Sequence, residues 1–179
     1  MKDMSQKNVI LCGFMATGKS SVGKRLAALV QYEFMDMDAE IEAEAGIPIK
    51  EIFSSQGEPA FRALESSMVE RIADRTGCVI AAGGGTIVNP KNLERLKRCG
   101  VTITLTADVH TILQRVGSGD DRPMLREGDR LERIRALMEQ RKQAYAKADI
   151  VFDTSALSVD EVAKHLVERL RDFGLILPE

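Results

Sequence analysis

The chain has 179 residues, of which 44% are hydrophobic and 29% charged, and its formal net charge is −2. This length fits one domain with a full hydrophobic core, and the composition excludes wholesale disorder. A charge so close to zero gives no reason to expect a nucleic-acid partner.

Five short apolar runs predict β-strands. Each run is apolar on successive residues rather than on alternate ones, a pattern typical of strands buried on both faces. In chain order the runs are 9–12, 34–36, 79–82, 101–105 and 150–152.

Helical patterns lie between these runs. Residues 20–31, 59–75 and 131–146 each carry apolar side chains on one face. A further helix is predicted to open at Asn89, with Pro90 in its first turn, and the last one at Ser158, where Glu161 completes a capping box. This alternation predicts an α/β fold of three layers, a five-stranded parallel sheet with helices on both sides, in a single domain spanning 1–179.

Two segments depart from the plain alternation. Residues 38–75 are predicted to form a mostly helical insertion between the second and third strands. Residues 117–128 are polar and rich in Gly, Asp and Arg, so we expect a mobile loop that acts as a lid.

A phosphate-binding motif follows the first predicted strand. The sequence Gly13-Phe-Met-Ala-Thr-Gly18-Lys19-Ser20 matches G-x-x-x-x-G-K-[ST] in full, between an apolar strand and an amphipathic helix. The glycines let backbone N–H groups point at phosphate oxygens, Lys19 reaches the β- and γ-phosphates, and the Ser20 hydroxyl is offered to Mg²⁺. Nucleotide binding alone does not separate kinases from switches or motors.

Two carboxylates, Asp36 and Asp38, are predicted to end the second strand. Residues i and i+2 of a strand share a side, and that side can open on the phosphate loop. One carboxylate could then accept a proton from an acceptor hydroxyl while the other supports Mg²⁺. The alternative is that Asp38 only caps a helix beginning at Ala39.

Three further features are ambiguous when taken singly. Arg62 and Glu65 have the spacing of an exposed helical ion pair. The triplet 83–85 is either a flexible glycine turn or a place where backbone approaches a ligand. Arg122 in the lid and Arg141 on the helix at 131–146 could both belong to solvated basic surfaces.

Taken together and in order, these motifs resemble shikimate kinase over nearly the whole chain, from about residue 8 to about residue 171. The resemblance rests on the following set: the phosphate loop, Asp36-x-Asp38, Phe61-Arg62-x-x-Glu65, Gly83-Gly84-Gly85, Arg122-Pro123-x-Leu125 and Arg141-x-x-x-Tyr145. Ala16 is a departure, because the family usually has a glycine at that position.

The resemblance implies a P-loop kinase fold and transfer of the ATP γ-phosphate to the 3-hydroxyl of shikimate, with Mg²⁺. It implies that Asp38 contacts the shikimate hydroxyls as candidate base and that Asp36 and Ser20 serve the metal. It also implies that the helical insertion at about 38–75 binds the acceptor. The residues implied for shikimate are Asp38, Arg62, Gly83, Gly84, Gly85 and Arg141. Those implied for ATP are Gly13, Ala16, Thr17, Gly18, Lys19, Ser20, Ser21, Arg115 and Arg122, with Lys19 and Arg122 also acting in catalysis.

Alternative functions remain at this point. They are a kinase of another small hydroxy acid such as gluconate, a nucleoside monophosphate kinase, and a nucleotide-dependent switch. Paired arginines favour a carboxylate acceptor, because guanidinium pairs bidentately with carboxylate.

The cellular setting follows from what the sequence lacks. The three cysteines form no CxxC pair, no stretch approaches the roughly 20 apolar residues of a membrane span, and the N-terminus has no apolar signal core. We expect a cytoplasmic monomer without membrane or nucleic-acid partners.

Overall fold

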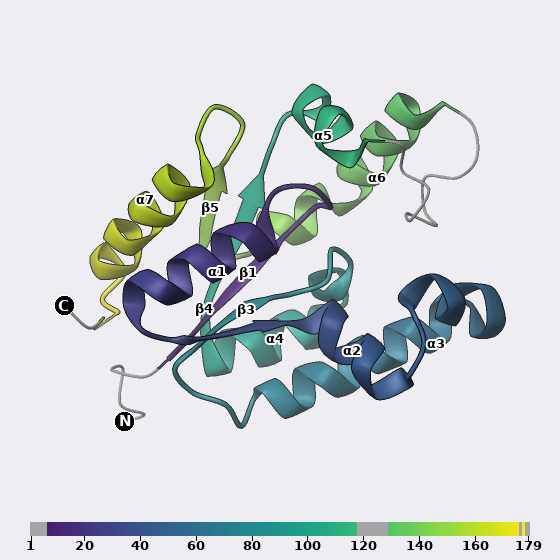
Figure 1. Ribbon diagram of the computed structural model, residues 1–179, viewed down its shortest axis with the longest axis horizontal. Coiled ribbons are helices and arrows are strands. Elements are labelled where there is room, and N and C mark those ends of the chain that lie inside the picture. Colours follow the sequence, from purple (N-terminus) through teal and green to yellow (C-terminus); the bar gives the residue numbers. More distant parts are fainter. Residues whose placement is uncertain (1–6, 118–128, 176, 178–179) are drawn as a thin grey trace.

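The computed structural model describes residues 7–117, 129–175 and 177. Its centre is a parallel sheet of five strands in the order β2-β3-β1-β4-β5 (Figure 1). The strands are β1 (Asn8–Gly13), β2 (Glu33–Asp36), β3 (Cys78–Ala81), β4 (Gly100–Thr106) and β5 (Ile150–Asp153). The predicted parallel sheet is confirmed, and each apolar run matches its strand to within one residue at either end.

Helices cover both faces of the sheet. They are α1 (Lys19–Val30), α2 (Met37–Ala45), α3 (Ile49–Ile72), the short 3₁₀ helix η2 (Thr86–Val88), α4 (Pro90–Cys99), α5 (Val109–Val116), α6 (Arg130–Tyr145) and α7 (Val159–Asp172). Successive residues of a strand point to opposite faces. In β1, Val9 and Leu11 therefore pack in one core with α1 and α7, while Ile10 and Cys12 pack in a second core with α3, α4, α5 and α6. Figure 1 shows α1 and α7 lying together on one side.

Two of the predicted helix starts are confirmed in detail. The Asn89 side chain accepts a hydrogen bond from the backbone of Lys91 at the start of α4. Ser158 and Glu161 form the reciprocal capping box of α7. Local cap chemistry of this kind is visible in sequence because donor and acceptor lie within one turn.

Two other helices differ from the prediction. The helix expected to begin at Pro59 is the second half of α3, which starts at Ile49 and is interrupted at Gly57 (φ 81°, ψ 169°). Helix α5 was not predicted at all, although the side chain of Asp108 caps it by accepting from the backbone of His110 and Thr111. A helical signal is nevertheless present, because Val109, Ile112, Leu113 and Val116 have the spacing i, i+3, i+4, i+7 and pack against the core.

The strand order decides where a site can lie. β1 is hydrogen-bonded to β3 on one side and to β4 on the other, so the chain leaves the sheet in different directions at the carboxyl ends of neighbouring strands. Ligands of open α/β sheets bind in the crevice outside such a switch point. The phosphate loop follows β1 and the glycine triplet follows β3, so both lie at the carboxyl ends of the strands beside this switch point.

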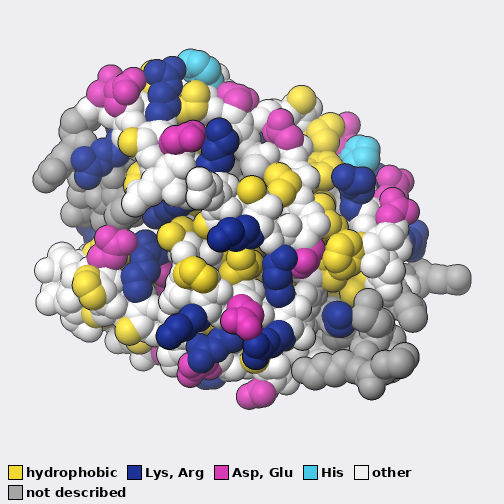
Figure 2. Space-filling model, turned by 180° about the vertical axis from the view of Figure 1, so that it is seen from behind, with side chains coloured by type: hydrophobic (Ala, Val, Ile, Leu, Met, Phe, Trp, Pro, Cys, Tyr) yellow, Lys and Arg dark blue, Asp and Glu magenta, His cyan; other side chains and the backbone are white. Residues whose placement is uncertain are grey.

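On the molecular face seen from behind, no one type of side chain dominates the surface. Basic, acidic and hydrophobic side chains are intermixed there, and none of these kinds covers the face (Figure 2). Within the described part of the chain, no helix combines the length and apolar character needed to cross a membrane.

Candidate active site

The segment 13–20 forms the turn between β1 and α1, as the phosphate-loop motif predicts. Gly18 has a φ of 91°, which L side chains rarely adopt, and no side chain caps the N-terminus of α1. Lys19 Nζ donates to the carbonyl oxygens of Gly13 and Phe14 at 3.0 and 2.9 Å. A helix N-terminus with a lysine folded over the same loop is a positive site suited to phosphate oxygens.

Other residues of the loop divide between shaping it and facing outward. Thr17 is 1% exposed, and its hydroxyl donates to the Phe14 carbonyl at 2.8 Å, so its side chain holds the loop together. Ser20 and Ser21 are exposed in the first turn of α1. Ala16 adopts the left-handed conformation with a φ of 60°, which costs a non-glycine residue about 1 kcal/mol or more. That conformation is the physical reason why glycine suits this position better.

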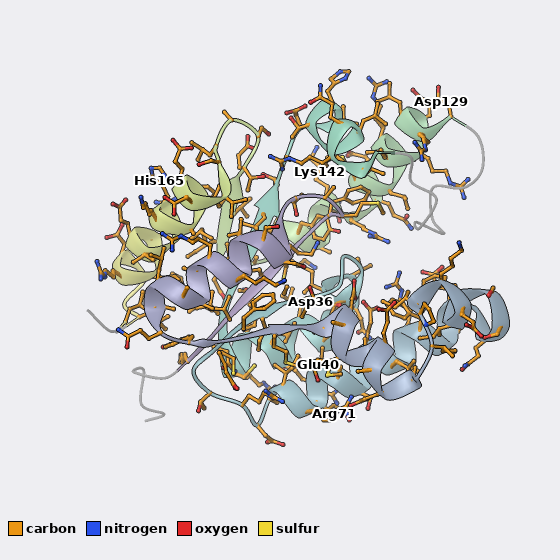
Figure 3. All side chains as sticks on the ribbon, viewed as in Figure 1. Asp36, Glu40, Arg71, Asp129, Lys142 and His165 are labelled. Atoms are coloured by element: carbon orange, nitrogen blue, oxygen red, sulfur yellow. The ribbon has the colours of Figure 1, made fainter. Side chains whose placement is uncertain are left out.

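Ser20 and Asp36 lie together, where α1 begins and β2 passes into α2 (Figure 3 labels Asp36). Ser20 Oγ donates to Asp36 Oδ2 at 2.5 Å. Among the residues that the structure describes, no three His, Cys, Asp or Glu side chains are grouped to hold a metal ion by themselves. Mg²⁺ is usually bound by one or two protein oxygens together with substrate phosphates and water. One hydroxyl and one carboxylate beside a phosphate loop fit that requirement.

Asp38 lies in the first turn of α2 and not at the end of β2, so the prediction that both aspartates share one side of a strand is wrong. The strand ends at Asp36, whose Oδ1 accepts from the backbone N–H groups of Asp38 at 3.1 Å and Ala39 at 3.4 Å. The alternative that Asp38 caps this helix is wrong as well, because Asp36 is the cap. Asp38 instead points at the triplet, since a Cβ on Gly83 would lie 3.1 Å from its Oδ1.

Arg62 and Glu65 on α3 form a half-buried pair. Arg62 NH1 donates to Glu65 Oε2 at 2.6 Å, and Arg62 NH2 donates to Glu58 Oε1 at 2.9 Å. Glu65 is only 1% exposed, so this is not the solvated ion pair that the spacing alone allowed. Burial by itself lowers the pKa of Arg62, but the charges and hydrogen bonds of Glu65 and Glu58 outweigh it and raise that pKa above its ordinary value. Arg62 therefore remains a cation.

The glycine triplet is explained by space rather than by backbone conformation. None of Gly83, Gly84 and Gly85 has a positive φ. A Cβ on Gly83 would lie 2.4 Å from Glu65 Oε1, and one on Gly85 would lie 2.2 Å from Arg62 NH1. The first and third glycines therefore let the Arg62–Glu65 pair pack directly against the loop after β3.

Arg141 is 7% exposed, unlike the neighbouring cations of α6. The exposed cations of this helix are Arg133, Arg135 and Lys142. Ile134, Arg141 and Tyr145 are its buried residues and share one face, at helical spacings of seven and four. The guanidinium carbon of Arg141 lies 5.8 Å from the centre of the Phe14 ring, and the Tyr145 hydroxyl donates to the Gly84 carbonyl at 2.6 Å.

These groups meet in a cavity of about 480 Å³, within the usual size range of small-ligand sites. Both arginines, Arg62 and Arg141, line it. The other lining residues are Met15, Asp38, Glu42, Pro48, Ile49, Lys50, Phe53, Phe61, Glu65, Gly84 and Gly85. Gly83 is not among them. The segment 42–53 belongs to the insertion at 38–75 that was expected to bind the acceptor, and Met15 belongs to the phosphate-loop motif. Neither was named as an acceptor-site residue, because they become neighbours of the two arginines only through the fold.

A second cavity of about 190 Å³ lies over the phosphate loop. It is lined by Met15, Ala16, Gly18, Lys19, Ser20, Ser21, Asp36, Asp38, Ala81 and Ala82. Asp38 and Met15 line both cavities. A carboxylate thus stands at the boundary between the phosphate site and the neighbouring cavity with two arginines.

Arg115, at the end of α5, reaches across to the phosphate loop. Its NH1 donates to the Ala16 carbonyl at 3.4 Å and to Thr154 Oγ1 at 3.2 Å, and its NH2 donates to the Thr154 carbonyl at 3.2 Å. The guanidinium plane is therefore held in one orientation beside the loop. Arg122 and all of the expected lid except Gly117 lie outside the described residues.

Comparison with known proteins identifies the family. A family model described as shikimate kinase matches residues 15–171. The shikimate kinase of Pelotomaculum thermopropionicum is 41% identical over 170 residues, covering 95% of this chain and 99% of that protein. The chain belongs to the shikimate kinase family. It is an ATP-dependent enzyme that phosphorylates the 3-hydroxyl of shikimate, in the pathway to chorismate and the aromatic amino acids.

Solved structures agree with this assignment. A shikimate kinase from Acinetobacter baumannii, described in complex with shikimate, is 32% identical and superposes with a TM-score of 0.92, covering 96% of this chain and 97% of that one. A gluconokinase from Sinorhizobium meliloti is 18% identical with a TM-score of 0.64, covering 93% of each chain, and shares the fold alone. The shikimate kinase prediction is therefore confirmed over the gluconate, nucleotide and switch alternatives.

Proposed function

We propose that the two cavities divide the shikimate kinase reaction between them. The small cavity over the phosphate loop takes the transferring phosphoryl group, and the larger cavity takes shikimate. The observation that carries the proposal is that Asp38 lines both cavities. A group at that boundary can touch the acceptor hydroxyl while the hydroxyl faces the γ-phosphate.

In the larger cavity, Arg62 and Arg141 bind the carboxylate of shikimate. Both are guanidinium groups at one cavity, and a planar carboxylate accepts bidentate hydrogen bonds from such groups. Gly84 and Gly85 form the floor of this site, Gly83 adjoins it, and α2 and α3 supply its outer wall, which makes 38–75 the acceptor-binding part of a single domain.

In the smaller cavity, Lys19 leaves its two loop carbonyls for the β- and γ-phosphates of ATP. Ser20 and Asp36 would hold Mg²⁺, which when bound would neutralise charge on the same phosphates. Arg115 presents its guanidinium face to the adenine, and Arg122, which lies outside the described residues, is assigned to the phosphates of ATP. Asp38 orients the acceptor hydroxyl and takes its proton, so that catalysis consists of positioning and charge neutralisation. The enzyme acts as a cytoplasmic monomer.

One chemical change made at two positions tests the division of roles. Asp38→Asn should reduce turnover by roughly a hundredfold or more, as expected for the loss of a general base, and should weaken shikimate binding. Asp36→Asn retains the helix cap, because Asn caps about as well as Asp, and should mainly raise the Mg²⁺ concentration needed for activity. Turnover, Mg²⁺ dependence and melting temperature are measured for both variants.

The two variants serve as controls for one another. A stable Asp38→Asn protein with normal turnover would exclude a catalytic role for Asp38. Equal Mg²⁺ dependence of both variants would exclude the separation of acceptor and metal roles.

A further inference from the structure

A buried chain of hydrogen bonds lies behind the Arg62–Glu65 pair. Thr86, the first residue of η2, is fully buried, and its hydroxyl donates to Glu65 Oε1 at 2.8 Å. Asn92 on α4 is 2% exposed, and its Nδ2 donates to the Thr86 carbonyl at 3.1 Å. This series of hydrogen bonds therefore extends from α4 through η2 to Glu65 at the acceptor cavity.

Glu65 links Thr86 to Arg62 through its two carboxylate oxygens. Oε2 accepts from Arg62, and Oε1 accepts from Thr86. A carboxylate held at both oxygens has a fixed plane, and the direction in which it accepts from Arg62 is fixed with it. Packing adds to this constraint, because a Cβ on Gly83 would come within 2.4 Å of Glu65 Oε1 and 3.0 Å of Thr86 Oγ1.

We propose that Thr86 is a positioning residue for the acceptor, acting through Glu65 on the guanidinium of Arg62. Thr86 does not line the acceptor cavity, so it touches no substrate atom in this arrangement. Its hydroxyl keeps Glu65 in the one rotamer that aims the Arg62 fork, and this lowers the cost of binding a carboxylate because the site is organised in advance. The inference rests on the proposed role of Arg62 in binding the shikimate carboxylate.

The test is Thr86→Val, which keeps the shape of the side chain and removes its hydroxyl. We expect the KM for shikimate to rise about tenfold, the effect of losing one hydrogen bond to a charged group. The KM for ATP and kcat should stay within about twofold, because the change affects the binding of the acceptor and not the transferring group. Thr86→Ser, which restores the hydroxyl, should return the KM for shikimate to near its original value.

Thr102→Val is the matched control. Thr102 on β4 is fully buried, and its hydroxyl also donates to a carboxylate, Asp149 Oδ2, at 2.7 Å. Neither residue lines the acceptor cavity. The Thr102 hydroxyl also accepts from the Asp149 backbone N–H at 3.1 Å, so Thr102→Val should lower the melting temperature at least as much as Thr86→Val while leaving the KM for shikimate unchanged. If Thr86→Val does not fold, Thr86→Ala replaces it and should give the same rise in KM.

The outcomes separate the inference from the proposed function. Arg62→Ala is measured in parallel. If Arg62→Ala raises the KM for shikimate and neither Thr86 variant does, the positioning role is overturned while the role of Arg62 stands. If Arg62→Ala leaves that KM unchanged, the proposed role of Arg62 is overturned, and the inference is overturned with it. A fall in kcat without a change in KM for Thr86→Val would also contradict it.

Discussion

Replacing Gly85 with alanine should weaken acceptor binding although no charged side chain is replaced. The backbone of Gly85 has a φ of −100°, which alanine adopts without strain, so the variant should fold. The new Cβ would lie 2.2 Å from Arg62 NH1 and 2.6 Å from its guanidinium carbon, and the guanidinium must therefore move away. Moving it breaks the 2.6 Å contact with Glu65. Because a hydrogen bond to a charged group contributes about 1.5–3 kcal/mol, shikimate binding should weaken roughly 10- to 150-fold.

Isothermal titration with shikimate and, separately, with ATP measures this effect. ATP affinity should be almost unchanged, since Gly85 does not line the cavity over the phosphate loop. The control is the same substitution in an Arg62→Ala background, where no guanidinium remains to be displaced. There Gly85→Ala should add almost nothing, a strong non-additivity between contacting residues. Wild-type shikimate affinity in Gly85→Ala, or an equal loss in both backgrounds, would refute the steric explanation of the triplet.

Three further predictions concern the phosphate loop and the cap of α5. Lys19→Ala should lower turnover roughly a hundredfold or more with the fold intact, and a folded variant with near-normal turnover would exclude the phosphate role. Ala16→Gly relieves about 1 kcal/mol of left-handed strain but adds a similar freedom to the unfolded chain, so chemical denaturation should show little net change and a clear loss of stability would contradict the strain. Hydrogen bonds from the Thr111 hydroxyl and backbone, with those from Ser155 and His110, lower the pKa of exposed Asp108 from 3.8 to about 2. The folded state favours the ionised form, so this stabilisation is present above pH 3.8 and is lost as the pH falls through about 2. The difference in melting temperature between wild type and Asp108→Asn should shrink over that window, and a constant difference would contradict it.

The sheet could be predicted from the sequence because each strand contains a short apolar run, and β1 and β3 are buried at every residue. Consecutive apolar residues indicate a strand that is buried on both faces. Val9 and Ile10, for example, pack in two different cores. The short helix α5 could have been predicted as well, because Val109, Ile112, Leu113 and Val116 repeat at helical spacing directly after the cap Asp108. Its β-branched residues, which disfavour helix, hide this signal. The break in α3 at Gly57 depends on how two helical segments pack, which no local pattern records.

The candidate site was predictable where residues that act together are close in sequence. The phosphate loop is the clearest case. The burial of Arg141 could have been found as well, because it falls on the same helical face as Ile134 and Tyr145. The sequence could not show that Asp36 rather than Asp38 caps α2, because this depends on the residue at which β2 ends and α2 begins. The sequence also could not show that the triplet leaves room for the Arg62–Glu65 pair. Gly85 and Arg62 are far apart in sequence and come into contact only when α3 packs beside the loop after β3.

The most direct test of the account compares shikimate with its methyl ester as substrates of the unaltered enzyme. The central claim is that Arg62 and Arg141 bind the shikimate carboxylate at one end of the acceptor cavity, while the 3-hydroxyl of shikimate contacts Asp38 at the other end. Esterification removes the charge and leaves the hydroxyl unchanged. The account predicts a KM for the ester higher by roughly a hundredfold, because partly buried guanidinium groups lose their anionic partner, with a much smaller change in kcat. An ester that is bound and phosphorylated as well as shikimate would contradict the account.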